Sequence, residues 1–282
     1  MEKLMLGKPV ADKITKELKT NIDQLNTKPK LAIVRVGQEE ADMAYERAAI
    51  KRMESIGILW DSIELPRNIS EAELISKINE LNEDKNVNGI LLFNPLPNHL
   101  DSKKVGESIN PLKDVDSLNP INLAKVMYRD ENAFAPCTPT AAMEILDYYG
   151  VEVEGKHAVV LGRSTVVGKP VSMLLLNRHA TVTICHSKTP NIEEIAKLAD
   201  ILLLAIGAPN FADINFVKEG AVVVDIGINV DDSGNLCGDV NMDSVIENVD
   251  LITPVPGGVG SVTTAVLAKH VVKAYIMQQN IE

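Results

Sequence analysis

The chain has 282 residues, of which 45% are hydrophobic, and its 39 acidic against 28 basic residues give a formal charge of −11. This apolar content is enough for one large or two ordinary domains and argues against a disordered chain. The negative charge disfavours nonspecific binding to nucleic acid or to anionic lipid, so we expect neither as a partner.

The three cysteines, Cys137, Cys185 and Cys237, show no metal-ligand spacing, and their odd number does not indicate a disulfide framework. We therefore expect no metal site and a reducing compartment. No stretch approaches the ~18 apolar residues of a membrane span, and no export signal is recognisable. These features predict a cytoplasmic protein without a membrane segment.

From about residue 30 onward, apolar runs of strand length alternate with helical patterns, which is typical of βαβ units around a mostly parallel sheet. Gly57 stands where a helix C-cap belongs. In the first half, strands are predicted over residues 30–36, 58–65 and 87–93, and amphipathic helices over residues 41–56 and 70–81.

Residues 135–140, Ala-Pro-Cys-Thr-Pro-Thr, interrupt this rhythm and predict a hinge between two domains. Thr138 and Pro139 suit the N-cap and first position of a helix over residues 141–149. A final helix is predicted over residues 262–278, and periodicity leaves open which domain it completes. Between them, strands are predicted over residues 157–161, 181–185, 201–206, 221–226 and 251–253.

Residues 162–170 form a turn between a predicted strand and an apolar helix, and they read Gly-Arg-Ser-Thr-Val-Val-Gly-Lys-Pro. Glycines let a backbone approach a pyrophosphate, and a helix N-terminus favours the anion. Ser164 takes the second glycine position of G-x-G-x-x-G and Gly168 falls one residue late, so an ordinary βα turn stays open. The candidate cofactor-binding residues here are Gly162, Arg163, Ser164, Val167 and Gly168.

The next predicted strand ends in Cys185, His186, Ser187 and Lys188, without the acid that binds the ribose 2′-hydroxyl of NAD. Arg163 and Ser187, with Lys188 as a third candidate, suit a 2′-phosphate, so NADP is favoured over NAD. In the alternative interpretation these are solvated loop residues.

Three stretches together resemble the methylenetetrahydrofolate dehydrogenase/methenyltetrahydrofolate cyclohydrolase family: residues 136–140, 155–170 and 253–260. Residues 199–210 and 224–229 also look like later strands of that family's cofactor domain, and Ile228 is carried over as a cofactor-binding position. The third stretch ends in Pro256-Gly-Gly-Val-Gly260. It departs from the family just beyond, where Ser261 and Val262 replace Pro and Met.

The resemblance implies a two-domain α/β fold with a cleft between the domains, and a homodimer. Residues 1–139 would form the catalytic folate-binding domain, with residues 263–282 packing back on it. Residues 140–262 would form a Rossmann-like NADP-binding domain.

The resemblance also implies a tetrahydrofolate one-carbon substrate, whose pterin would stack on Tyr45 and donate hydrogen bonds to Asp116. We expect both to act in the catalytic site. Alternatively, Tyr45 is a core residue, Asp116 a turn cap and the later loop a flexible turn. In that loop, glycines would allow close approach of backbone to substrate and nicotinamide; its candidate residues are Pro256, Gly257, Gly258 and Gly260.

One departure from the family falls on the helix that carries Tyr45. Four residues later the family has a Lys that activates water in the cyclohydrolase step, whereas this chain has Ala49. Residues four apart share a helical face, so Arg47 and Lys51 point elsewhere and cannot easily replace the amine.

A second departure is Phe93, where the family has a Gln that partners this Lys. Phenylalanine has no hydrogen-bonding atom, and strand alternation aims Asn94 at the other face. Both members of the hydrolytic pair are therefore missing together.

Hydride loss from the methylene carbon needs no obligatory general base, because the adjacent nitrogen stabilises the developing cation. We therefore predict NADP-dependent oxidation of 5,10-methylenetetrahydrofolate to 5,10-methenyltetrahydrofolate with little or no cyclohydrolase activity. Two alternatives stay open: a bifunctional enzyme with an atypical acid/base, and a noncatalytic folate- or nucleotide-binding module. A purely structural or interaction role is not supported, because the sequence has no internal repeats, low-complexity segments or coiled-coil heptads.

Overall fold

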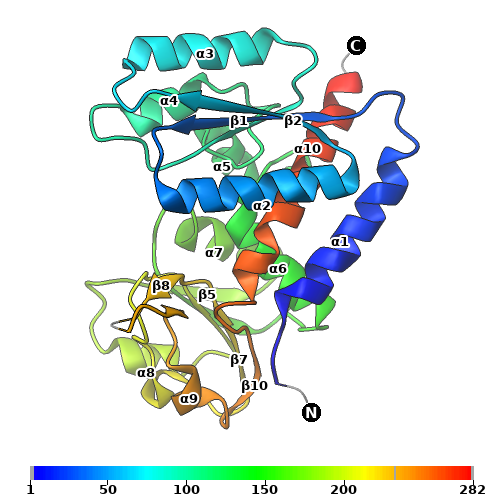
Figure 1. Ribbon diagram of the computed structural model, residues 1–282. Coiled ribbons are helices and arrows are strands. Elements are labelled where there is room, and N and C mark those ends of the chain that lie inside the picture. The colour runs from blue at the N-terminus through cyan, green and yellow to red at the C-terminus, as the bar shows by residue number, and fades with distance from the viewer. Residues whose placement is uncertain (1–2, 232, 281–282) are drawn as a thin grey trace. The chain divides into compact units, whose positions relative to one another are not determined.

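The computed structural model describes residues 3–231 and 233–280 and confirms the predicted two-domain α/β fold (Figure 1). One compact unit, the five-stranded unit, is formed by the described residues of Met1–Ala11 and Thr138–Thr263. The other, the three-stranded unit, is formed by those of Asp12–Cys137 and Thr264–Glu282. We expected residues 1–11 in the N-terminal domain. Of these, residues 3–11 group instead with the five-stranded unit, because Met5 N donates to Ile252 O and Ile252 N donates to Lys3 O on either side of a parallel bridge between Leu4 and Ile252.

The three-stranded unit is built on a parallel sheet in the order β2-β1-β3. Its helices α2 and α3 cover opposite faces of that sheet (Figure 1). Gly57 ends α2 in the left-handed region with φ 95°, as predicted. Ser70 begins α3 with a capping box to Glu73. The elements of this unit are β1 (Lys30–Val36), α2 (Glu40–Ile56), β2 (Leu59–Leu65), α3 (Glu71–Glu83), β3 (Gly89–Leu92), α4 (Ser102–Ser108) and α5 (Pro120–Met127).

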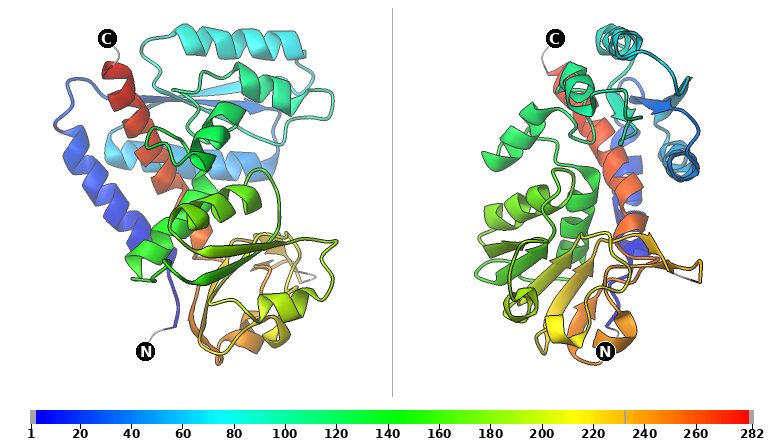
Figure 2. Two further views of the ribbon diagram at one scale, coloured as in Figure 1. Left: turned by 180° about the vertical axis from the view of Figure 1, so that it is seen from behind. Right: turned by 90° about the vertical axis from the view of Figure 1, so that its left-hand side faces the viewer.

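The five-stranded unit is a parallel sheet in the order β10-β7-β6-β4-β5. Helices α7 and α8 lie beside its strands (Figure 2). The strands are β4 (His157–Leu161), β5 (Thr181–Cys185), β6 (Ile201–Leu204), β7 (Ala221–Asp225) and β10 (Val249–Ile252). The remaining elements are α7 (Gly168–Asn177), α8 (Ile192–Ala196), η1 (Ile214–Phe216), β8 (Asn229–Val230), β9 (Leu236–Cys237), α9 (Met242–Val245) and η2 (Val259–Ser261).

The strand order contains a topological switch point. From β4 the chain passes to β5 on one side and then to β6 on the other side of β4. In open parallel sheets, ligands bind beyond the carboxyl ends of the strands at such a point.

Each unit has its own apolar core. In the three-stranded unit, residues of β1 and β3 such as Val34 and Leu92 pack with Leu74 and Ile78 of α3. In the five-stranded unit, the strands pack with residues that include Ala196 of α8 and Phe216. The buried strand residues explain why near-continuous apolar runs predicted these sheets.

The chain passes from one unit to the other within three helices: α1 (Gly7–Ile22), α6 (Cys137–Tyr148) and α10 (Thr263–Gln279). We expected α6 to begin after an N-cap at Thr138, but it begins at Cys137. Pro139 is tolerated inside its first turn because the N–H groups there have no intrahelical acceptor. The described part of α10 groups with the three-stranded unit from Thr264 onward. We found no helix within residues 3–231 and 233–280 that is long and apolar enough to cross a membrane.

Candidate active site

The switch point of the five-stranded sheet holds a pocket of about 320 Å³. Its walls come from the carboxyl ends of β4, β5 and β6 and from the segments that follow them. Four predicted cofactor residues meet here: Gly162, Arg163, Ser164 and Ser187. The sequence reasoning did not single out Ile192 or Phe211, which also line the pocket and stand on segments without a recognisable motif.

Gly162 and Gly168 make the close turn between β4 and α7 possible. Gly162 has φ 127°, and a Cβ there would lie 2.3 Å from the Ala205 carbonyl oxygen. A Cβ on Gly168 would lie 2.2 Å from the Gly162 carbonyl oxygen. Any other residue at either position would force the turn apart, which explains the two glycines despite their irregular spacing.

Ser164 also stabilises this turn through hydrogen bonds of its side chain and its backbone. Its Oγ accepts hydrogen bonds from the backbone N–H groups of Val167 at 3.1 Å and Gly168 at 3.3 Å. Its carbonyl oxygen accepts from Lys169 N at 3.0 Å. The serine thus satisfies N–H groups at the start of α7 that we expected to face a pyrophosphate. Val167 and Gly168 therefore shape the turn and do not line the pocket in this structure.

The electrostatic character of this switch-point pocket is neutral to positive. Among the described residues that line it, none is acidic, and Arg163 and His186 supply basic groups. Arg163 and Ser187 are exposed, so both can reach a ligand. His186 Nδ1 accepts from Lys188 N at 3.1 Å, which closes the turn after β5. The predicted acid-free strand end is therefore part of the pocket wall.

A second pocket, of about 210 Å³, lies beyond β7 and β10 at the same carboxyl edge. It is lined by the glycine-rich loop (residues 256–260), by residues 225–228 and by Leu236. The candidate substrate-binding residues Pro256, Gly257, Gly258 and Gly260 all line this pocket. Ile228 lines this loop pocket and does not line the switch-point pocket, because it follows β7, and β7 is the neighbour of β10, which leads into the loop.

Two buried carboxylates hold the segments that follow β6 and β7. Asp239 accepts from the N–H groups of Ile206 at 2.6 Å and Ala208 at 2.9 Å, and from Asn229 Nδ2 at 2.9 Å. Asp225 accepts from the backbone N–H groups of Gly227, Asp239 and Val240. Burial raises the pKa of Asp225 to about 6 despite these bonds. These carboxylates fix the edge on which both pockets lie.

In the three-stranded unit, Tyr45 of α2 contacts Phe93 just after β3. The rings meet edge to face, with centroids 6.0 Å apart and planes at 83°. Phe93 is 9% exposed, and its N–H donates to Val34 O at 3.0 Å. Because Tyr45 is only partly buried, its ring combines a fixed orientation with an accessible surface.

Asp116 lies in a turn that is bonded to the same sheet. Ile90 of β3 donates to Lys113 O at 2.6 Å and forms a parallel bridge with Asp114. Asp116 Oδ1 accepts from Cys137 N at 2.8 Å, and burial raises the pKa of this carboxyl group. Contacts through β3 therefore connect the turn that carries Asp116 with the Tyr45–Phe93 pair.

His270 of α10 supports this turn from the other side and was missed by sequence reasoning. Its Nδ1 donates to Val115 O at 2.9 Å and lies 3.8 Å from Cys137 Sγ. Burial lowers its pKa to about 4, so the imidazole is neutral near pH 7. A histidine on an apolar helix carries no sequence signal for this role.

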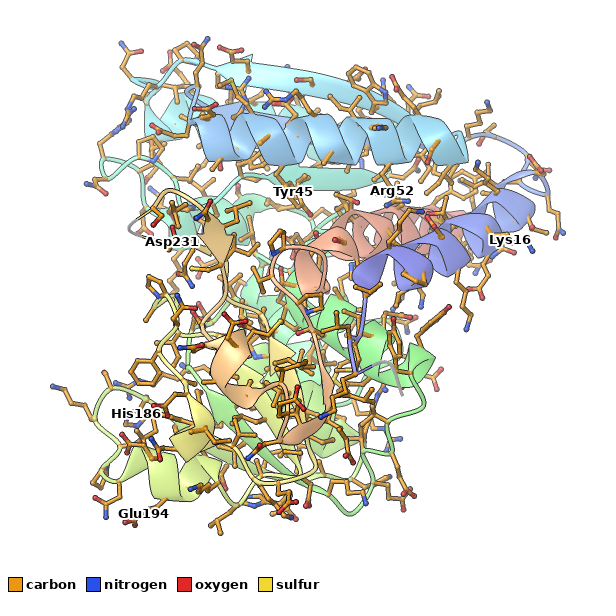
Figure 3. All side chains as sticks on the ribbon, turned by 60° about the horizontal axis from the view of Figure 1, so that its bottom comes forward. Lys16, Tyr45, Arg52, His186, Glu194 and Asp231 are labelled. Atoms are coloured by element: carbon orange, nitrogen blue, oxygen red, sulfur yellow. The ribbon has the colours of Figure 1, made fainter. Side chains whose placement is uncertain are left out.

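Ala49 is fully buried on α2, and its methyl group offers no acid or base. The polar group that follows on this face is Arg52, which sequence reasoning also missed (Figure 3). Tyr45 and Arg52 lie two helical turns apart on the same side of the helix. Arg52 donates to Thr15 Oγ1 at 2.7 Å and to Thr264 Oγ1 at 3.4 Å. Its guanidinium stays protonated at neutral pH, so it can orient water but cannot exchange protons.

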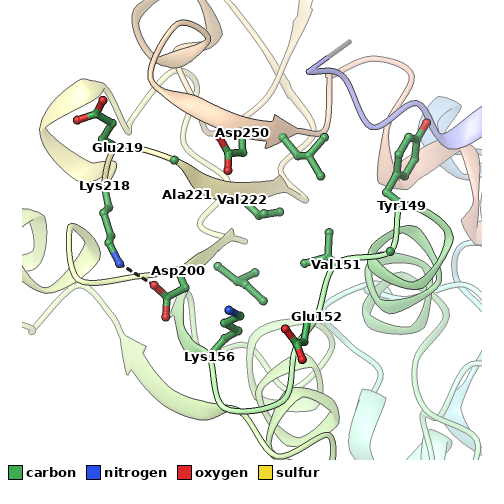
Figure 4. A pocket seen from close by; sticks show the side chains of 14 residues that line it. Tyr149, Val151, Glu152, Lys156, Asp200, Lys218, Glu219, Ala221, Val222 and Asp250 are labelled. Atoms are coloured by element: carbon green, nitrogen blue, oxygen red, sulfur yellow. Dashed lines mark hydrogen bonds and ion pairs between the residues drawn. The ribbon is translucent and has the colours of Figure 1, made fainter. Parts of the chain in front are cut away.

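A third pocket, of about 330 Å³, lies at the opposite, amino edge of the five-stranded sheet (Figure 4). It contains none of the predicted site residues. Lys218 and Asp200 form an ion pair of 2.6 Å across it, and Glu152, Glu219 and Asp250 add negative charge. Its volume equals that of the switch-point pocket within a few per cent, so position and charge, not size, distinguish the candidate site.

Comparison with known proteins gives a consistent result over both units. Residues 136–279 match the family described as tetrahydrofolate dehydrogenase/cyclohydrolase, NAD(P)-binding domain, and residues 5–116 match the catalytic domain of the same family. A Clostridioides difficile protein named Bifunctional protein FolD is 56% identical over 98% of both chains. Another of that name, from Alkaliphilus metalliredigens, is 50% identical over the full length of both.

Two solved structures are similarly close. The bifunctional FolD enzyme of Campylobacter jejuni is 40% identical and superposes with a TM-score of 0.95, covering 98% of this chain and 99% of that one. The FolD enzyme of Trypanosoma brucei, solved with NADP cofactor and an inhibitor, is 36% identical with a TM-score of 0.93 over 98% of both chains.

Proposed function

We propose that this chain, which belongs to the tetrahydrofolate dehydrogenase/cyclohydrolase family, oxidises 5,10-methylenetetrahydrofolate to 5,10-methenyltetrahydrofolate with NADP. The dehydrogenase function is the part that family and site support together. The observation that carries it is the pair of pockets at one sheet edge, one walled by the Gly162 turn and the other by the glycine-rich loop. A dinucleotide bound across such an edge spans both.

The described residues fit a 2′-phosphorylated dinucleotide, because the switch-point pocket has basic groups and no acid among its described lining residues. When bound, NADP supplies the nicotinamide that accepts the hydride. Arg163 and Ser187 would hold the 2′-phosphate. The glycine-rich loop would bring its backbone against the substrate and exclude water.

On the folate side, Tyr45 would stack on the pterin and Asp116 would accept its amino and ring N–H groups. Phe93 fixes the ring of Tyr45 from the side, and Cys137 N fixes one oxygen of Asp116. The carboxylate held in this way would present its oxygens to the substrate. Positioning of this kind is sufficient for hydride transfer, because no proton has to be removed in that step.

An assay with purified protein and methylenetetrahydrofolate tests this proposal, with NADP and NAD each supplied as the acceptor. We expect reduction of NADP at a higher kcat/KM than NAD. Arg163→Ala should lower kcat/KM for NADP about tenfold and leave that for NAD nearly unchanged, since one charged contact to phosphate contributes roughly 1.5 kcal/mol. Binding of both ligands without any reduction would favour a noncatalytic binding module instead.

We further propose that hydrolysis of the methenyl product at this site is weak or absent. The proposal rests on Ala49 and Phe93, because a buried methyl group and a phenyl ring offer no group that takes up or releases a proton. Arg52, on the same face of α2, does not supply one either.

Retained cyclohydrolase activity is the second candidate, and the family relatives favour it. Several relatives that are 50–56% identical to this chain carry the name bifunctional protein. In that case another group, with Arg52 orienting the water, would serve hydrolysis. An assay of methenyltetrahydrofolate hydrolysis by the purified protein distinguishes the two candidates. A hydrolysis rate well above that in buffer contradicts our proposal.

The double substitution Ala49→Lys with Phe93→Gln tests the same point by gain of function. We expect it to raise hydrolysis of methenyltetrahydrofolate measurably above the parent protein. Arg47→Lys is a matched control, because it adds an amine to the same helix on a different face. An equal increase with Arg47→Lys would show that the position of the amine on the helix is irrelevant.

We also propose that the three-stranded unit binds folate, that the five-stranded unit binds NADP, and that the protein acts as a cytoplasmic homodimer. Sedimentation equilibrium checks the assembly: a single species of twice the chain mass of 30.7 kDa is expected.

A further inference from the structure

Residues 3–7, here called the N-terminal strap, run beside β10 as an extra edge of the five-stranded sheet. Met5 N donates to Ile252 O at 2.8 Å, and Ile252 N donates to Lys3 O at 2.8 Å. Leu4 and Ile252 form a parallel bridge. The strap is therefore bonded to the strand that leads directly into the glycine-rich loop.

The strap is also fixed by side chains along its length. Lys3 Nζ donates to the carbonyl oxygens of Ile246 at 2.9 Å and Glu247 at 2.8 Å. Met5 is completely buried. Tyr149 Oη donates to Leu6 O at 3.0 Å. These contacts hold the strap in one register against the sheet.

The last strap residue, Gly7, touches the glycine-rich loop itself. Its N–H donates to Gly257 O at 2.8 Å. A Cβ at Gly7 would lie 2.1 Å from Gly258 O and 3.0 Å from Ser261 Cβ. Since the atom that it would meet belongs to the loop backbone, any larger residue would displace the loop.

We propose that the N-terminal strap is a positioning element that fixes the glycine-rich loop for substrate and nicotinamide. The loop needs such support, because Gly257 has φ 105° and adjacent glycines leave the backbone many conformations. A loop held in its working conformation costs less ordering on binding. This inference rests on the proposed function of the loop.

The geometry limits the effect to one end of the cofactor site. The switch-point pocket is built from the ends of β4, β5 and β6, and no strap residue lines it. Among the described residues, the strap bonds to β10, to the Ile246 and Glu247 carbonyls, to Tyr149 and to Gly257 of the loop. Its loss should therefore weaken contacts to the nicotinamide half and to folate, while contacts to the adenosine half persist.

The experiment compares Gly7→Ala and Tyr149→Phe with Tyr148→Phe as the matched control. Full-length proteins are assayed for kcat and KM with methylenetetrahydrofolate, and for the Kd of NADP and of adenosine 2′,5′-bisphosphate. We expect Gly7→Ala to lower kcat/KM about tenfold or more, since small misplacements at a reacting site have effects of this order. Tyr149→Phe should lower it roughly two- to fivefold by losing one hydrogen bond.

For both strap variants we expect a weaker Kd for NADP and an unchanged Kd for the bisphosphate. Unchanged NADP affinity and kinetics in a folded Gly7→Ala protein would overturn the proposal. Equal weakening of NADP and bisphosphate would do so too, because it indicates general damage.

If Gly7→Ala does not fold, Tyr149→Phe and Lys3→Met carry the same comparison. An inactive parent protein would refute the dehydrogenase proposal alone. The strap would then be judged by the two Kd values, which need no turnover.

Discussion

Ser117 adopts a conformation that favours glycine, directly after Asp116. Its φ is 61°, its side chain is 4% exposed, and its Oγ has no hydrogen-bond partner among the described residues. We predict that Ser117→Gly stabilises the protein by roughly 0.5–1 kcal/mol, because relief of left-handed strain exceeds the entropic cost of glycine. Urea unfolding measures the change. Ser117→Ala is the control that removes the hydroxyl but keeps the strain, so an equal gain in both variants would locate the cost in the hydroxyl.

His270 predicts a pH dependence of stability. Its native pKa is about 4, below the ordinary value of 6.5, because burial disfavours the cation and Lys273 and Lys269 repel it. Between these values the unfolded chain binds the proton and the native protein does not. The stabilisation is therefore present above pH 6.5 and is lost as pH falls towards 4, by about 3 kcal/mol in all.

Asp114 and Asp225 have the opposite effect on stability over this pH interval. Burial raises the pKa of each to about 6, so the native protein takes up these protons before the unfolded chain does and gains stability as pH falls. The comparison must therefore be a difference between the parent protein and His270→Gln, each unfolded in urea at several pH values. We expect the parent to lose more stability than the variant as pH falls from 6.5 to 4. Parallel curves would contradict the assignment.

At the scale of elements, a buried carboxylate holds the backbone of the loop after β6. Asp239 is fully buried and accepts three backbone N–H groups of residues 206–208. We predict that Asp239→Ala lowers the free energy of unfolding by about 3 kcal/mol, because buried donors would lose their acceptor. Asp243→Ala, at an exposed position of α9, is the control and should change it by less than about 0.5 kcal/mol. Equal effects would contradict a specific role for Asp239.

Sequence patterns predicted the central strands because their apolar runs are buried on both faces, as in Leu31–Val34 and Ile201–Leu204. The edge strands β2 and β5 are mostly exposed or partly buried and were predicted from shorter apolar or β-branched runs. Helix α1 was not predicted, and the strap has too few residues for a periodic signal. The predicted boundaries of the elements were less accurate than their existence. Strand β3 ends at Leu92 and not at residue 93, and helix α6 begins at Cys137 and not after Thr138. Hydrogen bonds to distant segments decide such ends.

For the molecule as a whole, a cofactor that binds only the native state must stabilise it. We predict that NADP at a concentration of one hundred times its Kd adds about 2.7 kcal/mol, and raises the melting temperature by roughly 5 °C or more. NAD at the same concentration should raise it less, because Arg163 and Ser187 would find no 2′-phosphate. Thermal unfolding followed by fluorescence measures both. Equal shifts would contradict the preference for NADP.

Candidate site residues could be predicted where they belong to short sequence motifs, but not where their position depends on the fold. Gly162, Ser164 and the glycine-rich loop were recognised from short motifs. The supports His270, Asp239 and Gly7 were not, because their partners lie far away in the chain. Substitution of such supports should change the site without touching a ligand.

The central claim is hydride transfer to NADP without efficient hydrolysis of the product. The most direct measurement quantifies NADPH by its fluorescence and methenyltetrahydrofolate by chromatography during one reaction of purified protein with methylenetetrahydrofolate and NADP. We predict that both accumulate in a one-to-one ratio, with methenyltetrahydrofolate decaying only at its rate in buffer. Accumulation of NADPH while methenyltetrahydrofolate stays near zero would contradict the loss of hydrolysis, and no NADPH would contradict the account altogether.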